Sequence, residues 1–155
     1  MQFKIKKLRA SHIKREYIYT INHPNTKKYI QFAKLGKHKK KKIDLINYLK
    51  KLPKNELLFG IFYNNDEHVA NFKFQPVKNR VYIGFLTLNK YQGKGIFKKS
   101  FHKILKLFRL CYPQLNKLYL GVDKNNFRAI SLYKRLGFKN LKNTSRTMFL
   151  KISKG

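Results

Sequence analysis

The stretch YQGKGIF, residues Tyr91 to Phe97, decides how the rest of the chain is organised. It follows an apolar, β-favouring run from Val81 to Leu88 and precedes an amphipathic run from Ile96 to Cys111. A glycine-rich turn between a strand and a helix lets the backbone approach an anion, and the first N–H groups of the helix point at it. Lys94 and Lys98 add positive charge there. The stretch predicts a phosphate-binding turn, although an ordinary strand-to-helix turn has the same signature.

The composition is that of a folded and strongly basic chain. Its 155 residues are 43% hydrophobic and 15% aromatic, which predicts one domain over residues 1–155 with a buried core. Thirty-seven Lys and Arg face six Asp and Glu, for a formal charge of +31. Such a charge attracts nucleic acid, anionic lipid, nucleotide-linked substrates or an acidic protein. A lysine-rich compositional bias would explain the lysines but not the shortage of acids.

The cysteine, histidine and hydropathy patterns limit the cellular location and the metal content that we expect. The single Cys111 excludes an intramolecular disulfide framework, and its rarity fits a reducing compartment. No run approaches the ~18 apolar residues of a membrane span, and the N-terminal residues lack the apolar core of a signal peptide. The histidines are scattered without metal-ligand spacing. We therefore expect a cytoplasmic protein with no transmembrane segment and no metal.

Hydrophobic periodicity predicts both strands and helices, and hence a mixed α/β sheet in a single domain. Turn-forming clusters between the middle strands indicate an antiparallel meander there. The expected strands are Gln2–Leu8, Leu57–Tyr63, His68–Phe74, Arg80–Leu88, Lys117–Val122 and Arg146–Ile152, with a turn at Pro76–Asn79. The expected helices are a run through Ile21 that Ser11 caps, Ile43–Leu52, Ile96–Cys111 and Asn126–Leu136, with a short helix or an irregular segment in Thr26–Leu35.

A second motif follows the long helix and makes the first more specific. It runs from Asn126 to Phe138 and reads NFRAISLYKRLGF. In this order and spacing the two motifs resemble the GNAT family of N-acetyltransferases, over Arg80 to Phe138. The glycine loop matches the family pattern Gln/Arg-x-x-Gly-x-Gly/Ala except that Phe97 takes the final, small position. The resemblance implies an α+β fold whose mostly antiparallel central sheet is flanked by helices.

The same resemblance implies acetyl-CoA, a CoA thioester, as acyl donor. Backbone N–H groups of Gln92 to Lys98 would bind the CoA pyrophosphate, and the strand end at Phe85 to Thr87 would face pantetheine and polarise the thioester. Tyr133 would protonate the departing thiolate, although its helical spacing equally allows a core aromatic. The full set implied at the donor site is Phe85, Leu86, Thr87, Gln92, Gly93, Lys94, Gly95, Ile96, Phe97, Lys98, Asn126, Ala129 and Tyr133.

The central strands contain no carboxylate that could serve as the general base. Many members of the family carry one there, but neither 80–88 nor 117–122 contains an acid. His23 is the candidate base, because histidine has a suitable pKa, with a turn or core histidine as the alternative. The acids lie elsewhere, at Glu16, Asp44, Glu56, Asp66, Glu67 and Asp123.

Three functions remain open at this point. The first is acetyl transfer to a primary amine of a small and anionic acceptor, such as a nucleotide-linked amino sugar, because Ile21 to Asn25 resembles the early region of family members that act on such sugars. The second is protein N-acetylation, or acyl transfer from an acidic carrier protein. The third is a nucleic-acid- or membrane-associated binding protein on a degenerate acetyltransferase scaffold, which the charge favours. Acceptor, acyl chain length and oligomeric state are left open.

Overall fold

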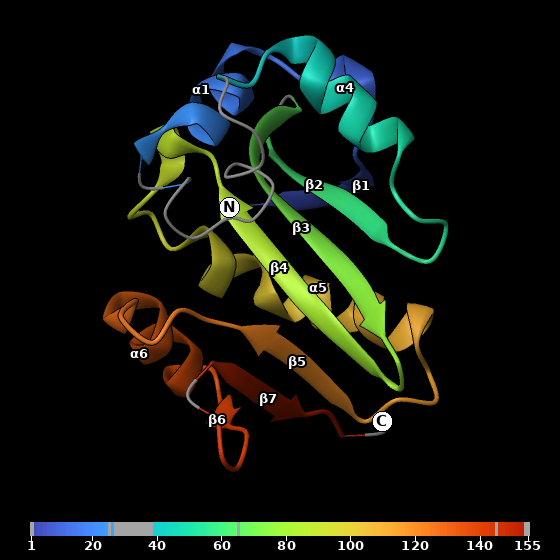
Figure 1. Cartoon of the computed structure of the whole chain (residues 1–155), viewed down its shortest axis with the longest axis vertical. Coiled ribbons are helices and arrows are strands. Elements are labelled where there is room, and N and C mark those ends of the chain that lie inside the picture. Colours follow the sequence, from blue (N-terminus) through green and yellow to red (C-terminus); the bar gives the residue numbers. More distant parts are fainter. Residues whose placement is uncertain (1, 25, 27–38, 65, 145, 154–155) are drawn as a thin grey trace.

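The computed structural model describes residues 2–24, 26, 39–64, 66–144 and 146–153. Their strands form one seven-stranded sheet in the order β1-β2-β3-β4-β5-β7-β6 (Figure 1). Neighbouring strands are antiparallel except β4 and β5, which are parallel. The expected mixed, mostly antiparallel sheet flanked by helices is therefore confirmed. The strands are β1 (Phe3–Lys7), β2 (Leu57–Tyr63), β3 (Glu67–Val77), β4 (Arg80–Thr87), β5 (Lys117–Gly121), β6 (Lys139–Asn140) and β7 (Thr147–Lys151).

Helices flank this sheet, and α5 has more buried residues than any other described helix. The described helices are α1 (Arg15–Asn22), α4 (Lys42–Lys50), α5 (Ile96–Cys111) and α6 (Phe127–Arg135), with short 3-10 turns η1 (Ala10–His12) and η2 (Asn89–Tyr91). Figure 1 shows α5 lying across one face of β3 and β4. Phe101, Ile104 and Phe108 recur at helical spacing and are buried there. The Phe108 ring meets that of Phe74 edge-on, with centroids 5.7 Å apart.

The parallel pair β4–β5 is the point where the sheet opens. Its ladder is formed at Tyr82 and Tyr119, whereas β4 continues to Thr87. Figure 1 shows the two strands diverging beyond that point, toward the end where α6 lies. The end of β4 is thus left with backbone groups that β5 does not use, and a ligand can reach them.

Two details differ from the sequence prediction. Ser11 does not cap the first helix: it lies inside η1, and α1 begins at Arg15 with Lys14 as its N-cap. Pro76 does not turn the chain but pairs with Val81 inside β3. The partner strand β2 already ends opposite Phe74, so Pro76 lies beyond the β2–β3 ladder and its missing N–H removes no bond from that ladder.

The remaining differences concern short or undescribed segments. The two-residue strand β6 was not predicted, since it is too short to carry a hydrophobic period. The short helix or irregular segment expected in Thr26–Leu35 lies outside the described residues except for Thr26. Among the described helices, none has the length and apolar character needed to span a membrane.

Candidate functional site

The glycine loop adopts the conformation that an anion site requires. Gly93 and Gly95 have φ angles of +79° and +70°, in the left-handed region that side chains disfavour. Gly95 is the N-cap of α5, and no side chain of the described residues accepts from the first N–H groups of the helix. The first turn of α5 contains no acidic residue either. These N–H groups and the positive end of the helix dipole therefore remain available to a ligand.

A cavity of about 640 Å³ opens between this loop, the end of β4 and α6; we call it the loop cavity. All of the predicted donor-site residues except Lys94 line it. Its lining is Thr26, Phe85, Leu86, Thr87, Tyr91, Gln92, Gly93, Gly95, Ile96, Phe97, Lys98, Asn126, Arg128, Ala129, Leu132, Tyr133 and Arg135. The structure therefore brings together residues that lie on two separate sequence motifs.

The loop cavity carries positive charge. Lys98, Arg128 and Arg135 line it, and no Asp or Glu is among its described lining residues. Arg128 lies against the loop, because a Cβ added to Gly93 would come within 3.9 Å of its guanidinium. Lys94 is not among the lining residues, but its Nζ lies 5.6 Å from the centre of the ring of Tyr91, which is one of them. Sequence reasoning missed the two arginines, although both fall within the second motif.

Tyr133 lies at the apolar end of the loop cavity. Its ring packs edge-on against Phe97, with centroids 5.6 Å apart, and against Phe138 at 5.9 Å. Phe97 also contacts Phe85 at the end of β4, at 4.5 Å. Phe97, the departure from the family pattern, thus fills the space between β4 and Tyr133. Burial raises the pKa of Tyr133, so its hydroxyl keeps its proton at neutral pH.

Two amide side chains fix the geometry of the loop cavity. The Oδ1 of Asn126 accepts a hydrogen bond from the Ala129 N–H at 3.3 Å and caps α6. This bond leaves the Nδ2 of Asn126 for a ligand. The Nε2 of Gln92 donates to the carbonyl oxygen of Thr87 at 3.4 Å and ties the loop to the strand end.

His23 stands apart from these residues. It follows α1 as the C-cap, and its ring lies 5.8 Å from that of Tyr19. It lines neither the loop cavity nor the second cavity described next. The role of general base predicted for His23 therefore has no geometric support and stays a prediction.

A second cavity, of about 530 Å³, lies between α1, the β2–β3 turn and η2; we call it the acidic cavity. Three of the six acids of the chain line it. The lining is His12, Lys14, Arg15, Glu16, Tyr17, Tyr19, Phe62, Asp66, Glu67, His68, Leu88, Lys90 and Tyr91. Sequence reasoning missed this cavity, because its acids come from separate parts of the chain and only the fold brings them together.

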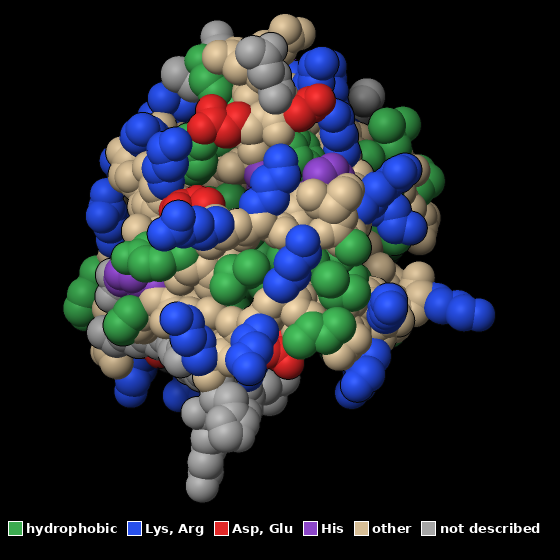
Figure 2. Space-filling model, turned by 90° about the horizontal axis from the view of Figure 1, so that it is seen from above, with side chains coloured by type: hydrophobic (Ala, Val, Ile, Leu, Met, Phe, Trp, Pro, Cys, Tyr) green, Lys and Arg blue, Asp and Glu red, His purple; other side chains and the backbone are tan. Residues whose placement is uncertain are grey.

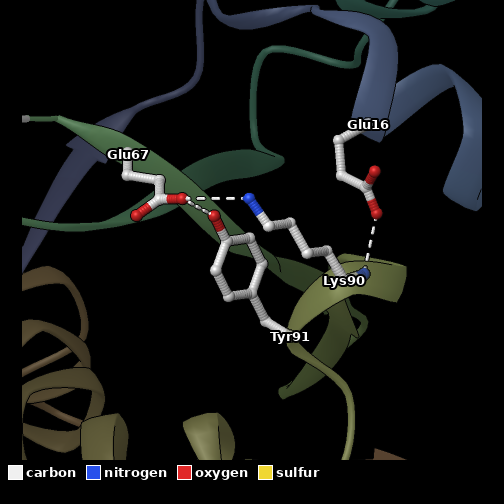
Figure 3. Close-up of polar contacts among 4 residues, drawn as sticks. All are labelled: Glu16, Glu67, Lys90 and Tyr91. Atoms are coloured by element: carbon white, nitrogen blue, oxygen red, sulfur yellow. Dashed lines mark hydrogen bonds and ion pairs between the residues drawn. The ribbon is translucent and has the colours of Figure 1, made fainter.

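The acids of this cavity hold the segment just before the glycine loop (Figure 3). The Glu67 carboxylate accepts a hydrogen bond from the Tyr91 hydroxyl and lies 3.7 Å from the Nζ of Lys90. The Glu16 Oε1 accepts from the backbone N–H of Lys90 at 2.7 Å. Tyr91 lines both cavities, so the position of its ring affects the shape of each.

Histidine forms part of the wall of the acidic cavity. The His68 ring packs between Tyr17, at 5.7 Å, and Phe62, at 5.1 Å, and one of its ring nitrogens is hydrogen-bonded to Asn71. Burial lowers the pKa of His68, and burial with the nearby cation Lys6 also lowers that of His12. Both rings are therefore mainly neutral at pH 7. Within the described ranges, no group of His, Cys, Asp or Glu side chains is placed to hold a metal ion.

Comparison with known proteins places this geometry in a family. The family model described as "Acetyltransferase (GNAT) family" matches residues 16–138. The spermine/spermidine N(1)-acetyltransferase of Bacillus subtilis (strain 168) is 32% identical over 83 residues, which cover 53% of this chain and 49% of that protein. The spermidine N(1)-acetyltransferase of Escherichia coli (strain K12) is 37% identical over 62 residues, which cover 40% of this chain and 33% of that protein. The match thus spans about half, or less, of the length of these relatives.

Solved structures extend the likeness to nearly the whole chain. A spermidine N-acetyltransferase from Vibrio cholerae, in complex with CoA and spermine, superposes with a TM-score of 0.76. The superposition covers 99% of this chain and 97% of that one at 19% identity, and at that identity it shows the fold alone. The resemblance predicted from the two motifs is confirmed by the family model, which contains both of them. The chain belongs to the acetyltransferase (GNAT) family.

Proposed function

We propose that the protein transfers an acetyl group from acetyl-CoA to a primary amine of a small molecule. The observation that carries this proposal is the loop cavity. An uncapped helix N-terminus with left-handed glycines, cationic side chains and a buried phenol all face one space. Such a set suits a ligand with a phosphate at one end and a reacting thioester at the other.

The lining fits the successive parts of acetyl-CoA. The N–H groups that follow Gly95 would bind the pyrophosphate, with Lys98 and Arg128 neutralising its charge. The unpaired backbone at the end of β4 would hold the pantetheine arm, and a backbone N–H there would polarise the carbonyl. When bound, acetyl-CoA supplies the activated acyl group. The described residues around the cavity contain no acid that would repel the phosphates.

The reaction forms a bond from the amine nitrogen to the acetyl carbon and breaks the bond from that carbon to sulfur. The nitrogen loses a proton and the sulfur gains one. Tyr133 is protonated and can give its proton to the sulfur. A phenol has an ordinary pKa of about 10 against about 8.5 for a thiol, so this transfer depends on position and on the charge that develops on sulfur.

We propose a cationic acceptor of the polyamine class. The named relatives act on spermine and spermidine, and three acids line the cavity that shares Tyr91 with the loop cavity. Aromatic rings such as Tyr17 and Tyr19 stand beside these acids, and ammonium groups bind well to that combination. The anionic amino sugar expected from the sequence has weaker support, because it would meet these carboxylates.

Charge also favours a reactive amine that is neutral. Arg135 also lines the loop cavity and is not assigned to the pyrophosphate, so its positive charge would lower the pKa of an amine bound there. The distal ammonium groups of a polyamine would remain charged beside Glu16 and Glu67. The described lining of the loop cavity offers no carboxylate or histidine as base, so water would carry the released proton to solvent.

The purified chain tests this proposal directly. Acetyl-CoA at a concentration of about 100 times its Kd should stabilise the fold by about 2.7 kcal/mol, measured as a rise in Tm. Release of free thiol should then be compared for spermidine, a nucleotide-linked amino sugar and an acidic peptide. We expect spermidine to react with the highest kcat/KM. No Tm shift at millimolar acetyl-CoA would contradict the donor, and a preference for the amino sugar would contradict the acceptor class.

Nucleic-acid binding is the second candidate, and the formal charge of +31 favours it. Figure 2 shows Lys and Arg side chains scattered over the whole of one face, with no single stripe. Affinity that rests on counterion release falls steeply with salt, whereas acetyl-CoA binding should survive moderate salt. A salt titration of both ligands separates the two functions. Binding to acidic proteins and a cytoplasmic location remain predictions.

A further inference from the structure

Thr26 is the lining residue of the loop cavity that the proposed donor does not explain. The other described lining residues come from 85–98 and 126–135, the two segments assigned to acetyl-CoA. Thr26 instead follows α1, from the first part of the chain. It is 4% exposed, and its Oγ1 has no hydrogen-bond partner among the described residues.

A buried hydroxyl without a partner destabilises a fold. Most buried polar groups in folded proteins are hydrogen-bonded, and each exception calls for a reason. A valine would fill the same volume without that cost. Because Thr26 lines the loop cavity, a ligand bound there can supply the missing partner. The amide side chains of the cavity are bonded elsewhere in the described structure: Gln92 donates to Thr87, and the Oδ1 of Asn126 accepts from Ala129.

We propose that the Thr26 hydroxyl binds the reactive amine of the acceptor and turns its lone pair toward the acetyl carbon. The proposal rests on the acetyl transfer proposed above. A hydroxyl oxygen accepts a hydrogen bond from an amine N–H without a full negative charge. It therefore positions the amine without favouring the unreactive ammonium form, as a carboxylate would. This suits a cavity whose described lining contains no Asp, Glu or His.

The position of Thr26 in the chain supports a role with the acceptor. Helix α1 supplies Glu16, Tyr17 and Tyr19 to the acidic cavity, and Thr26 follows the same helix. One short segment would thus contact both ends of a polyamine. Its acid would bind a distal ammonium group, and its hydroxyl would bind the amine that reacts.

Two variants of Thr26 test the proposal. Thr26→Val keeps the shape and removes the hydroxyl, whereas Thr26→Ser keeps the hydroxyl and removes a methyl. We expect Thr26→Val to lower kcat/KM for spermidine about 10-fold, the effect of one hydrogen bond in the transition state, and Thr26→Ser to stay within about 3-fold of wild type. The Tm shift with acetyl-CoA should be the same in all three proteins. The Tm without ligand should not fall in Thr26→Val, because no partner is lost.

A simple monoamine makes the test specific. It has no distal ammonium group, so Thr26→Val should lower its kcat/KM by the same factor as for spermidine. Unchanged kcat/KM in Thr26→Val would overturn the proposal, as would loss of the acetyl-CoA shift, which would assign the hydroxyl to the donor. If Thr26→Val does not fold, equal activity of Thr26→Ser and Thr26→Ala would overturn it instead. Failure of the wild type to bind acetyl-CoA would overturn the acetyl transfer itself and is seen without any variant.

Discussion

The two cavities of this protein are neighbours of similar size, and they differ in the acids that line them. The loop cavity, of about 640 Å³, is lined by Lys98, Arg128 and Arg135 and by no acid among its described residues. The acidic cavity, of about 530 Å³, contains half of the acids in a chain with a formal charge of +31. A compositional excess of lysine would not sort the few acids in this way. The acidic cavity also contains Lys14, Arg15 and Lys90, so the two cavities differ in the presence of carboxylates and not in the sign of a net charge.

The hydrogen bonds and the ion pair in Figure 3 connect the acidic cavity to the segment that precedes the glycine loop. Glu16 and Glu67 bind Lys90 and Tyr91, which lie directly before the glycine loop. A cation that competes for these carboxylates would change the support of the loop. Although the cavities are adjacent, we expect substitutions in one to change donor binding or chemistry and substitutions in the other to change acceptor binding. The effects expected below decrease from the first variant to the last.

Removal of the Tyr133 hydroxyl should give the largest effect and confine it to the chemical step. Phenylalanine keeps the ring contacts with Phe97 and Phe138, at 5.6 and 5.9 Å. Loss of a general acid lowers turnover by about 100- to 10,000-fold. We expect Tyr133→Phe to lower kcat within this range and to change the Kd for acetyl-CoA less than about 3-fold, measured by single-turnover kinetics and calorimetry. Unchanged kcat would make Tyr133 a packing residue.

Gly95→Asp should abolish donor binding without affecting the acidic cavity. Its φ of +70° disfavours any side chain, and a carboxylate at the N-terminus of α5 would repel a phosphate. We expect the Kd for acetyl-CoA to rise about 100-fold from strain and repulsion together. Gly84→Asp is the matched control: it adds the same charge on β4, and a Cβ there meets no atom within 4 Å. Equal loss of binding in both variants would point to net charge and away from the loop.

Glu67→Gln should affect a cationic acceptor and spare the donor. Glutamine can still accept from the Tyr91 hydroxyl, but the charge that faces Lys90 is removed. We expect KM for spermidine to rise about 10-fold, the effect of one charged hydrogen bond, with acetyl-CoA affinity unchanged. Asp123→Asn loses the same charge outside both cavities and should leave KM unchanged. A monoamine acceptor should respond to neither variant, and an equal response to both would remove the acidic cavity from the mechanism.

The residues of the loop cavity can be predicted from local sequence motifs, whereas those of the acidic cavity are brought together only by the fold. Gln92 to Lys98 and Asn126 to Tyr133 are continuous motifs, and the family resemblance that they carry implied residues that line one space. Glu16 and Glu67 instead lie on α1 and β3, and no local pattern relates them before the sheet is built. His23 stays a prediction without geometric support, because a suitable pKa range says nothing about where the side chain lies.

The fold was predicted best where the hydrophobic period is long. The helix Ile96–Cys111 and the strand Leu57–Tyr63 have the predicted bounds, since several turns or alternations define each. Proline at position 76 was read as a turn signal, but β2 ends before it and leaves an edge where proline is tolerated. Tertiary pairing thus overrode a sound local rule.

The smallest predicted effect concerns stability and the wall of the acidic cavity. The pKa of His68 is lowered mainly by burial, so the unfolded chain binds a proton before the folded one as pH falls through the ordinary value of about 6.5. The free energy of unfolding should therefore be full above pH 7 and decrease as pH falls toward 5. We expect the Tm of His68→Gln to fall less over this range than that of wild type, by calorimetry at matched ionic strength. Some pH dependence should remain, because the pKa of His12 is lowered as well. His102→Gln, at an exposed position of α5, should follow the wild type. If His68→Gln loses as much Tm as wild type, the neutral ring of His68 does not stabilise this wall.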